Sequence, residues 1–260
     1  MRFQAADKAV LRIVGQAWDE AARRAGPRLK CEKGCSVCCF GPFPITAIDA
    51  WRLGEGLAAL ESRNPETAAG IRERAGSAVA TLRQAFPGEP DSGRLRLHPE
   101  QEATFAARLS HLPCPALDPD SGGCLLYEHR PVACRLNGPA LKLYGDPLPH
   151  CPLCFKGSSA ADIEAARVTV ELDGRDGDLV RAWESAGGEE YRTVIAYALH
   201  NSPPPEPAPS PEGPDQIADA LHGPSNGARP RLRDGAGPQS HGAGPQPNRG
   251  QTPLSLGPDL

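Results

Sequence analysis

The chain has 260 residues, of which 39% are hydrophobic and only 5% aromatic, enough for one ordinary domain or two small ones. Its formal net charge is -4, so the protein lacks the overall positive field that attracts nucleic acid or an anionic membrane. The 28 glycines and 29 prolines exceed average usage and predict that part of the chain is unfolded.

The first residues do not form a secretory signal, because Asp7, Lys8 and Arg12 interrupt the apolar run that such a signal needs. No apolar stretch approaches the roughly 18 residues of a membrane span. We therefore predict a cytoplasmic protein whose thiols stay reduced. We expect no nucleic acid and no membrane among its partners, and we leave open an unknown protein partner.

Hydrophobic periodicity and start signals predict helices along most of the chain. In the first, apolar residues recur at three- and four-residue spacing, and Gly26-Pro27 ends it. Thr46 and Asp49 form a capping-box pattern for the second. Asn64-Pro65-Glu66 supplies an N-cap, a first-turn proline and an acid for the third. The expected helical spans are 4–25, 46–61, 64–86, 98–110, 159–173 and 177–200.

Strand signals are few, and Leu125-Leu126-Tyr127 is the best short candidate. The fold class is therefore mainly α: a small helical domain with cysteine-rich loops, stapled by a metal centre, plus a disordered C-terminal tail. That tail is rich in proline and glycine and cannot bury enough apolar surface to offset its ordering entropy. The expected parts are an N-terminal helix (1–27), a cysteine-cluster domain (28–156), C-terminal helices that pack on it (157–201) and the tail (202–260).

Nine cysteines lie between the helices and need an explanation in a reducing compartment. A disulfide framework fits poorly, because the count is odd and no export signal is visible. Inert core cysteines would not cluster as C-x3-C-x2-C-C. We predict that all nine are metal ligands: Cys31, Cys35, Cys38, Cys39, Cys114, Cys124, Cys134, Cys151 and Cys154.

The adjacent pair Cys38-Cys39 is unusual for a metal site. Cys-x-x-Cys spacing lets one turn direct two thiolates at one metal, but neighbouring side chains diverge. Either one of the pair is a packing residue, or the two serve different metals. Nine thiols could fill two four-coordinate sites with one left over.

Several charged and aromatic residues lie close in sequence to the cysteines at positions 124–151 and could support a metal site. Arg130 and Arg135 could offset the negative charge of a thiolate site, although any given arginine is about as often a solvated surface residue. His129 and His150 could be ligands in mixed sites, but a lone histidine more often has no such role. Tyr127 is better explained as a core residue than as a catalytic acid.

Two stretches resemble the YkgJ-type cysteine-cluster family, whose members are described as zinc- or iron-chelating CxxCxxCC-domain proteins. They are Cys31–Cys39, and Cys114-Pro-Ala-Leu-Asp together with Gly123–Arg135, and the resemblance covers roughly residues 28–156. One departure is the three-residue gap between Cys31 and Cys35, where the family name implies two. The ligand role of Cys31 and its neighbours is therefore open.

The resemblance implies a cysteine domain that is often labelled an iron–sulfur oxidoreductase. Flagellin lysine N-methylases carry a similar domain, which implies a protein-modifying role as an alternative. The cofactor is an iron–sulfur cluster or Zn²⁺, and the resemblance does not choose between them.

Three functions are compatible with these cysteines. They are an iron–sulfur protein with redox activity, a structural zinc module for partner binding, and an enzyme that uses S-adenosylmethionine. Cys31, Cys35 and Cys38 match the spacing of radical enzymes, but so few strands cannot build their βα barrel. No G-x-G-x-x-G turn is present. A reactive thiol at Cys38 or Cys39 is a further alternative.

Overall fold

The structure is a computed structural model that describes residues 2–96 and 99–203. The predicted disordered tail, residues 202–260, lies outside the described residues apart from its first two. Eight α-helices occur in the described ranges, so the mainly α fold class is confirmed. They are α1 (Arg2–Ala25), α2 (Ala47–Arg63), α3 (Pro65–Leu82), α4 (Pro99–Arg108), α5 (Val132–Leu136), α6 (Ala160–Ala166), α7 (Arg175–Ser185) and α8 (Ile195–Asn201).

The start signals of α2 and α3 act as the sequence predicted. Thr46 accepts a hydrogen bond from the Asp49 amide, and the Asp49 carboxylate accepts one from the Thr46 amide, so the capping box is complete. Asn64 caps α3 by accepting from the Thr67 amide at 3.1 Å. A capped helix start needs only residues close in sequence, which is why these boundaries were predictable.

Seven short strands form three small sheets, more strand than the sequence indicated. β1 (Pro44–Thr46) pairs antiparallel with β7 (Arg192–Val194), and β2 (Gly88–Glu89) with β3 (Arg94–Leu95). β4 (Leu141–Leu143) pairs antiparallel with β5 (Asp146–Pro147) and parallel with β6 (Val168–Val170). The strands join segments far apart in sequence, which local patterns do not reveal.

Two predicted helices were too long and the predicted strand was wrong. The span 159–173 is helical only to Ala166, because the β-branched run 168–170 pairs with β4 instead. The span 177–200 is divided into α7, β7 and α8, with Gly187 at a positive φ of 86° after α7. Leu125 and Leu126 lie in a turn, and a 3-10 turn begins at Tyr127.

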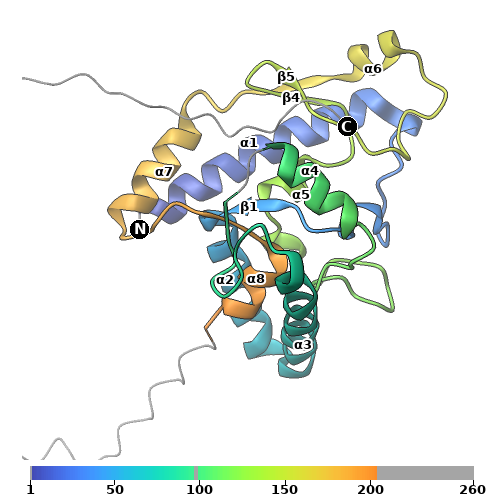
Figure 1. The fold of residues 1–260 in the computed structure, drawn as a ribbon. Coiled ribbons are helices and arrows are strands. Elements are labelled where there is room, and N and C mark those ends of the chain that lie inside the picture. Colours follow the sequence, from blue (N-terminus) through green and yellow to red (C-terminus); the bar gives the residue numbers. More distant parts are fainter. Residues whose placement is uncertain (1, 97–98, 204–260) are drawn as a thin grey trace, which may run out of the picture. The chain divides into compact units, whose positions relative to one another are not determined.

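The helices pack in two groups (Figure 1). Helices α2, α3 and α8 contact one another around buried leucines and alanines, including Leu53, Leu57 and Leu199. The long helix α1 lies against α7, α5, α6 and β6, with Val10 and Val14 in a second core. Among the residues the structure describes, no helix is both long and apolar enough to span a bilayer.

Candidate metal centre

A groove of about 690 Å³ collects the cysteines of the chain. Eight of the nine line it, and Cys154 lies beside Cys31 just outside. They come from five places along the sequence: the 31–39 motif, the loop at Cys114, Cys124, helix α5 and the turn 151–154. The prediction that all lie on loops is wrong for Cys134, which is inside α5.

The first set of thiols, here called the five-cysteine group, comprises Cys38, Cys39, Cys114, Cys124 and Cys134. The thiols of Cys38 and Cys39 share a hydrogen bond, and Cys39 is electrostatically coupled to Cys114 and Cys124. Backbone contacts hold the set together, because the Cys114 amide donates to the Cys39 carbonyl at 2.8 Å. An isolated bridge pairs Leu117 with Cys124.

The second set, here called the four-cysteine group, comprises Cys31, Cys35, Cys151 and Cys154. The Cys31 thiol interacts electrostatically with the other three thiols, most strongly with that of Cys154. Two tight turns carry the pairs: the Cys35 amide donates to the Glu32 carbonyl at 3.0 Å, and the Cys154 amide to the Cys151 carbonyl at 2.8 Å. The Lys30 amide donates to the Cys154 sulfur at 3.3 Å, which joins the two turns.

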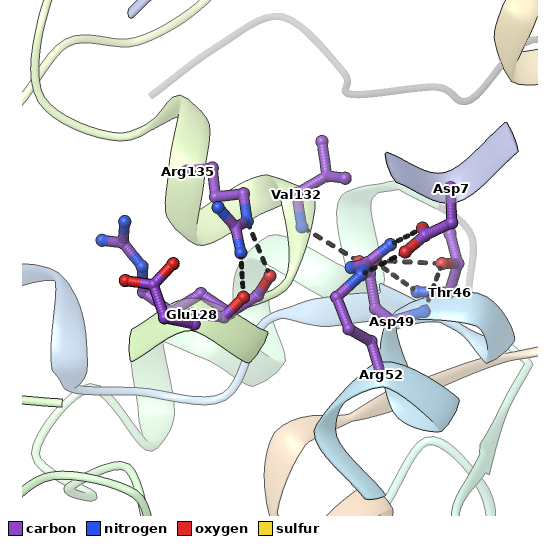
Figure 2. Close-up of polar contacts among 8 residues, drawn as sticks. Asp7, Thr46, Asp49, Arg52, Glu128, Val132 and Arg135 are labelled. Carbon is purple, nitrogen blue, oxygen red and sulfur yellow. Dashed lines mark hydrogen bonds and ion pairs between the residues drawn. The ribbon is translucent and has the colours of Figure 1, made fainter. Parts of the chain in front are cut away.

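A buried ion-pair network positions the helix that carries Cys134 (Figure 2). Arg52 of α2 lies between Asp7 of α1 and Asp49 of α2, with N–O distances of 2.5 Å to each, and all three are at most 5% exposed. The Asp49 carboxylate also accepts a hydrogen bond from the Val132 amide, which donates to Oδ1 at 2.9 Å. Asp49 therefore caps α2 and fixes the start of α5, two residues before Cys134.

Sequence reasoning found only one of the two roles of Asp49. The capping box was visible as a local pattern at Thr46 and Asp49, whereas the bond to Val132 spans 83 positions. Asp7 was seen only as a charge that interrupts an apolar run. No signal in the sequence pairs it with Arg52.

The two arginines proposed as charge supports have different surroundings. Arg130 stacks on the Tyr127 ring, 3.5 Å from its centroid, and acts electrostatically on Cys38, Cys124 and Cys134. Arg135 donates instead to the carbonyls of Arg130 and Glu128, so it braces the turn before α5 (Figure 2).

The structure gives the two histidines packing roles. A Cβ at Gly56 would lie 2.5 Å from the His129 ring, so that ring packs closely against α2. His150 contacts Phe155 edge-on at 5.3 Å. Neither lines the groove. Tyr127 is 55% exposed, which overturns its interpretation as a core residue.

Most thiols in the groove resist ionisation. Burial raises the pKa of Cys31 to about 12, with a further increase from Cys154 and Cys151. Burial likewise raises the pKa of Cys114 to about 12, and it raises those of Cys124 and Cys134. Thiolates crowded together in an apolar environment are costly, and a bound cation would offset that cost.

Cys38 differs from the other thiols. The hydrogen bond with Cys39 lowers the pKa of Cys38 to about 6, and Arg130 contributes in the same direction. The same hydrogen bond raises the pKa of Cys39. The two adjacent thiols therefore face each other in the same group, and whether they serve one metal or two stays a prediction.

The donors of both groups suit zinc or iron in type, since they are all thiols with no carboxylate or histidine among them. As the side chains stand, no three His, Cys, Asp or Glu residues in ranges 2–96 and 99–203 form a set that could hold a metal ion. One rotatable bond separates each sulfur from the backbone, so convergence requires side-chain rotation. The nine ligand assignments therefore remain predictions.

The fold and the groove define a small, mainly α protein with a cysteine-rich site. Residues 30–152 match the CxxCxxCC family model, described as "Putative zinc- or iron-chelating domain". The family that the cysteine motifs resemble is the one whose model matches, so that prediction is confirmed over residues 30–152. No curated protein and no solved structure gives a significant match.

Proposed function

We propose that the protein is a metal-binding protein that chelates zinc or iron through the cysteines of the groove. The observation that carries this proposal is the gathering of nine free cysteines, from segments up to 123 positions apart, around one groove. Core packing alone has no need for such an arrangement, since most of these thiols are only half-buried or exposed.

The family match supports chelation and leaves the metal open. All-thiolate ligands serve both Zn²⁺ and iron–sulfur clusters, so ligand type does not separate them. Cys-rich iron–sulfur centres are redox-active, which agrees with the oxidoreductase role implied by the resemblance. A structural zinc ion would instead contribute to folding.

The test is elemental analysis and an absorption spectrum of full-length protein purified without oxygen. We expect at least one equivalent of zinc, or iron with matching sulfide and visible absorption that dithionite bleaches. Protein that contains neither metal, and takes up neither Zn²⁺ nor a reconstituted cluster, would refute the proposal.

Partner binding is a second candidate function. Large hydrophobic side chains are exposed beside the five-cysteine group: Val37 at 44%, Phe40 at 45% and Tyr127 at 55%. A zinc module whose rim binds another protein would use such residues. Replacing Val37 and Phe40 with serine should abolish capture of a partner while leaving metal content unchanged; unchanged capture would exclude this rim as the interface.

A further inference from the structure

We propose that the four-cysteine group is a metal centre of its own, separate from the five-cysteine group, so that the motif Cys31–Cys39 is divided between two centres. This inference rests on the proposed function, that the cysteines bind metal. It goes beyond the family match, which ends at residue 152 and leaves out Cys154. Division of one motif is unexpected, because consecutive cysteines in it are separated by at most three residues.

Backbone contacts hold Cys31 and Cys151 of the four-cysteine group close together around Gly138. The Cys151 amide donates to the Gly138 carbonyl at 3.0 Å, and a Cβ at Gly138 would lie 2.7 Å from the Cys31 sulfur. Gly138 therefore lies between two of the four cysteines, with a positive φ of 117° that favours glycine. Trp18 of α1 fixes this loop by donating to the Asn137 carbonyl at 3.0 Å.

The two groups also pack against different cores. Cys151 and Cys154 are buried with Ala25, Ala140 and Phe155. The cysteines at 114, 124 and 134 pack instead against the core of α2, α3 and α8. The chain crosses from one group to the other between Cys35 and Cys38.

Each group has its own positive charges. Arg130 acts on the five-cysteine group. A second depression, of about 520 Å³, adjoins the four-cysteine group at Cys35; it is lined by three lysines and one acid, Lys30, Lys33, Lys156 and Glu32, so its net charge is positive. Four thiolates around Zn²⁺ carry a net double negative charge, which nearby cations offset. Two sets of cations are what two separate thiolate centres would need.

Matched double variants within the motif test the division. Cys31→Ser/Cys35→Ser removes two thiols from the four-cysteine group, and Cys38→Ser/Cys39→Ser removes two from the other. Each pair has one exposed and one half-buried member, so their effects on folding are comparable. We expect full-length protein to bind two Zn²⁺ per chain and each variant to bind one, with Co²⁺ absorption showing thiolate ligation in both variants.

A second pair of variants covers the case in which a cysteine variant does not fold. Gly138→Ala should lose one Zn²⁺, because the added methyl group meets the Cys31 sulfur. Gly145 also has a positive φ, of 90°, but a Cβ there would meet no atom within 4 Å. The control variant Gly145→Ala should therefore keep two Zn²⁺.

The outcomes separate this inference from the proposed function. One Zn²⁺ per native chain, or loss of all metal in both cysteine variants while circular dichroism shows them folded, would overturn the two-centre inference and leave metal binding intact. A native chain that binds no metal would overturn both.

Discussion

At the residue scale, the most informative contrast is between two adjacent thiols. Cys38 has a pKa lowered to about 6 by its hydrogen bond with Cys39, whereas burial raises the pKa of Cys114 to about 12. The nucleophile in alkylation is the thiolate, so the reactivity of a cysteine rises with the fraction of its thiol that is ionised. Local spacing left either Cys38 or Cys39 as the candidate reactive thiol, and the contacts in the groove select Cys38.

Metal-free protein should therefore be alkylated first at Cys38. At pH 7, above its pKa, Cys38 is mostly thiolate, and the rate should fall about tenfold per pH unit once the pH is below 6. Peptide mass spectrometry after brief iodoacetamide treatment measures the site. The Arg130→Gln variant should react more slowly at pH 6, because the loss of its charge raises the pKa of Cys38. Equal labelling of Cys38 and Cys114 at pH 7 would contradict the expectation.

At the scale of elements, the buried network of Asp7, Arg52 and Asp49 joins three helices. It ties α1 to α2 through Arg52 and α2 to α5 through the Val132 amide (Figure 2). A buried charge that loses its partner is costly. The same carboxylate that begins α2 therefore also determines where Cys134 lies.

Replacing Asp49 with asparagine should lower the free energy of unfolding by about 3 kcal/mol, since Arg52 loses one of its two buried carboxylate partners. Zn²⁺ affinity at the five-cysteine group should fall about tenfold, because α5 is less firmly held. Urea unfolding and competition with a chromophoric chelator measure the two effects.

Asp178→Asn is the matched control, because it breaks an exposed ion pair with Arg181 on α7. Both measurements should be unchanged in it. Equal effects of the two substitutions, or an equal loss at both metal centres in Asp49→Asn, would argue against a positioning role for Asp49.

At the scale of the whole molecule, the cysteines bring together segments that lie far apart in the sequence. The four-cysteine group links the segment after α1 to the segment before α6, and the five-cysteine group links the motif to α5. A metal that binds only the folded chain stabilises it by mass action.

Removal of metal should thus lower the unfolding temperature. At a free Zn²⁺ concentration about 1,000 times the dissociation constant, one site contributes about 4 kcal/mol. Differential scanning calorimetry before and after dialysis against a chelator measures the loss, and re-addition of Zn²⁺ should restore it. An unchanged unfolding temperature in protein shown to be metal-free would exclude a folding role.

Metal binding should also weaken as pH falls. The pKa values of Cys31 and Cys114 are raised to about 12, so these thiols are protonated at pH 7 and must release protons to bind. Affinity should rise with pH by about tenfold per unit for each proton released. Isothermal titration calorimetry in buffers with different ionisation enthalpies counts those protons. A pH-independent affinity between pH 6 and 8 would contradict protonated thiols in the metal-free groove.

The sequence by itself determined the helical class, the capped starts of α2 and α3, the resemblance to the cysteine-cluster family and the residue types of the candidate site. Each depends on neighbours within a few positions: Thr46 with Asp49, Asn64 with Thr67, and the spacing of the 31–39 motif. The short strands were missed because β6 forms only by pairing with β4, 27 positions earlier, and β7 with β1.

Only the tertiary structure decided how the cysteines are divided. Spacing groups Cys31 with Cys39 and Cys114 with Cys154, because it measures separation along the chain. Contacts instead place Cys31 with Cys154 and Cys39 with Cys114, since backbone hydrogen bonds and separate cores bring those distant segments together. The residue types in the local motifs identify the sulfur atoms that could bind a metal. Packing between distant segments decides which of those sulfur atoms lie close together.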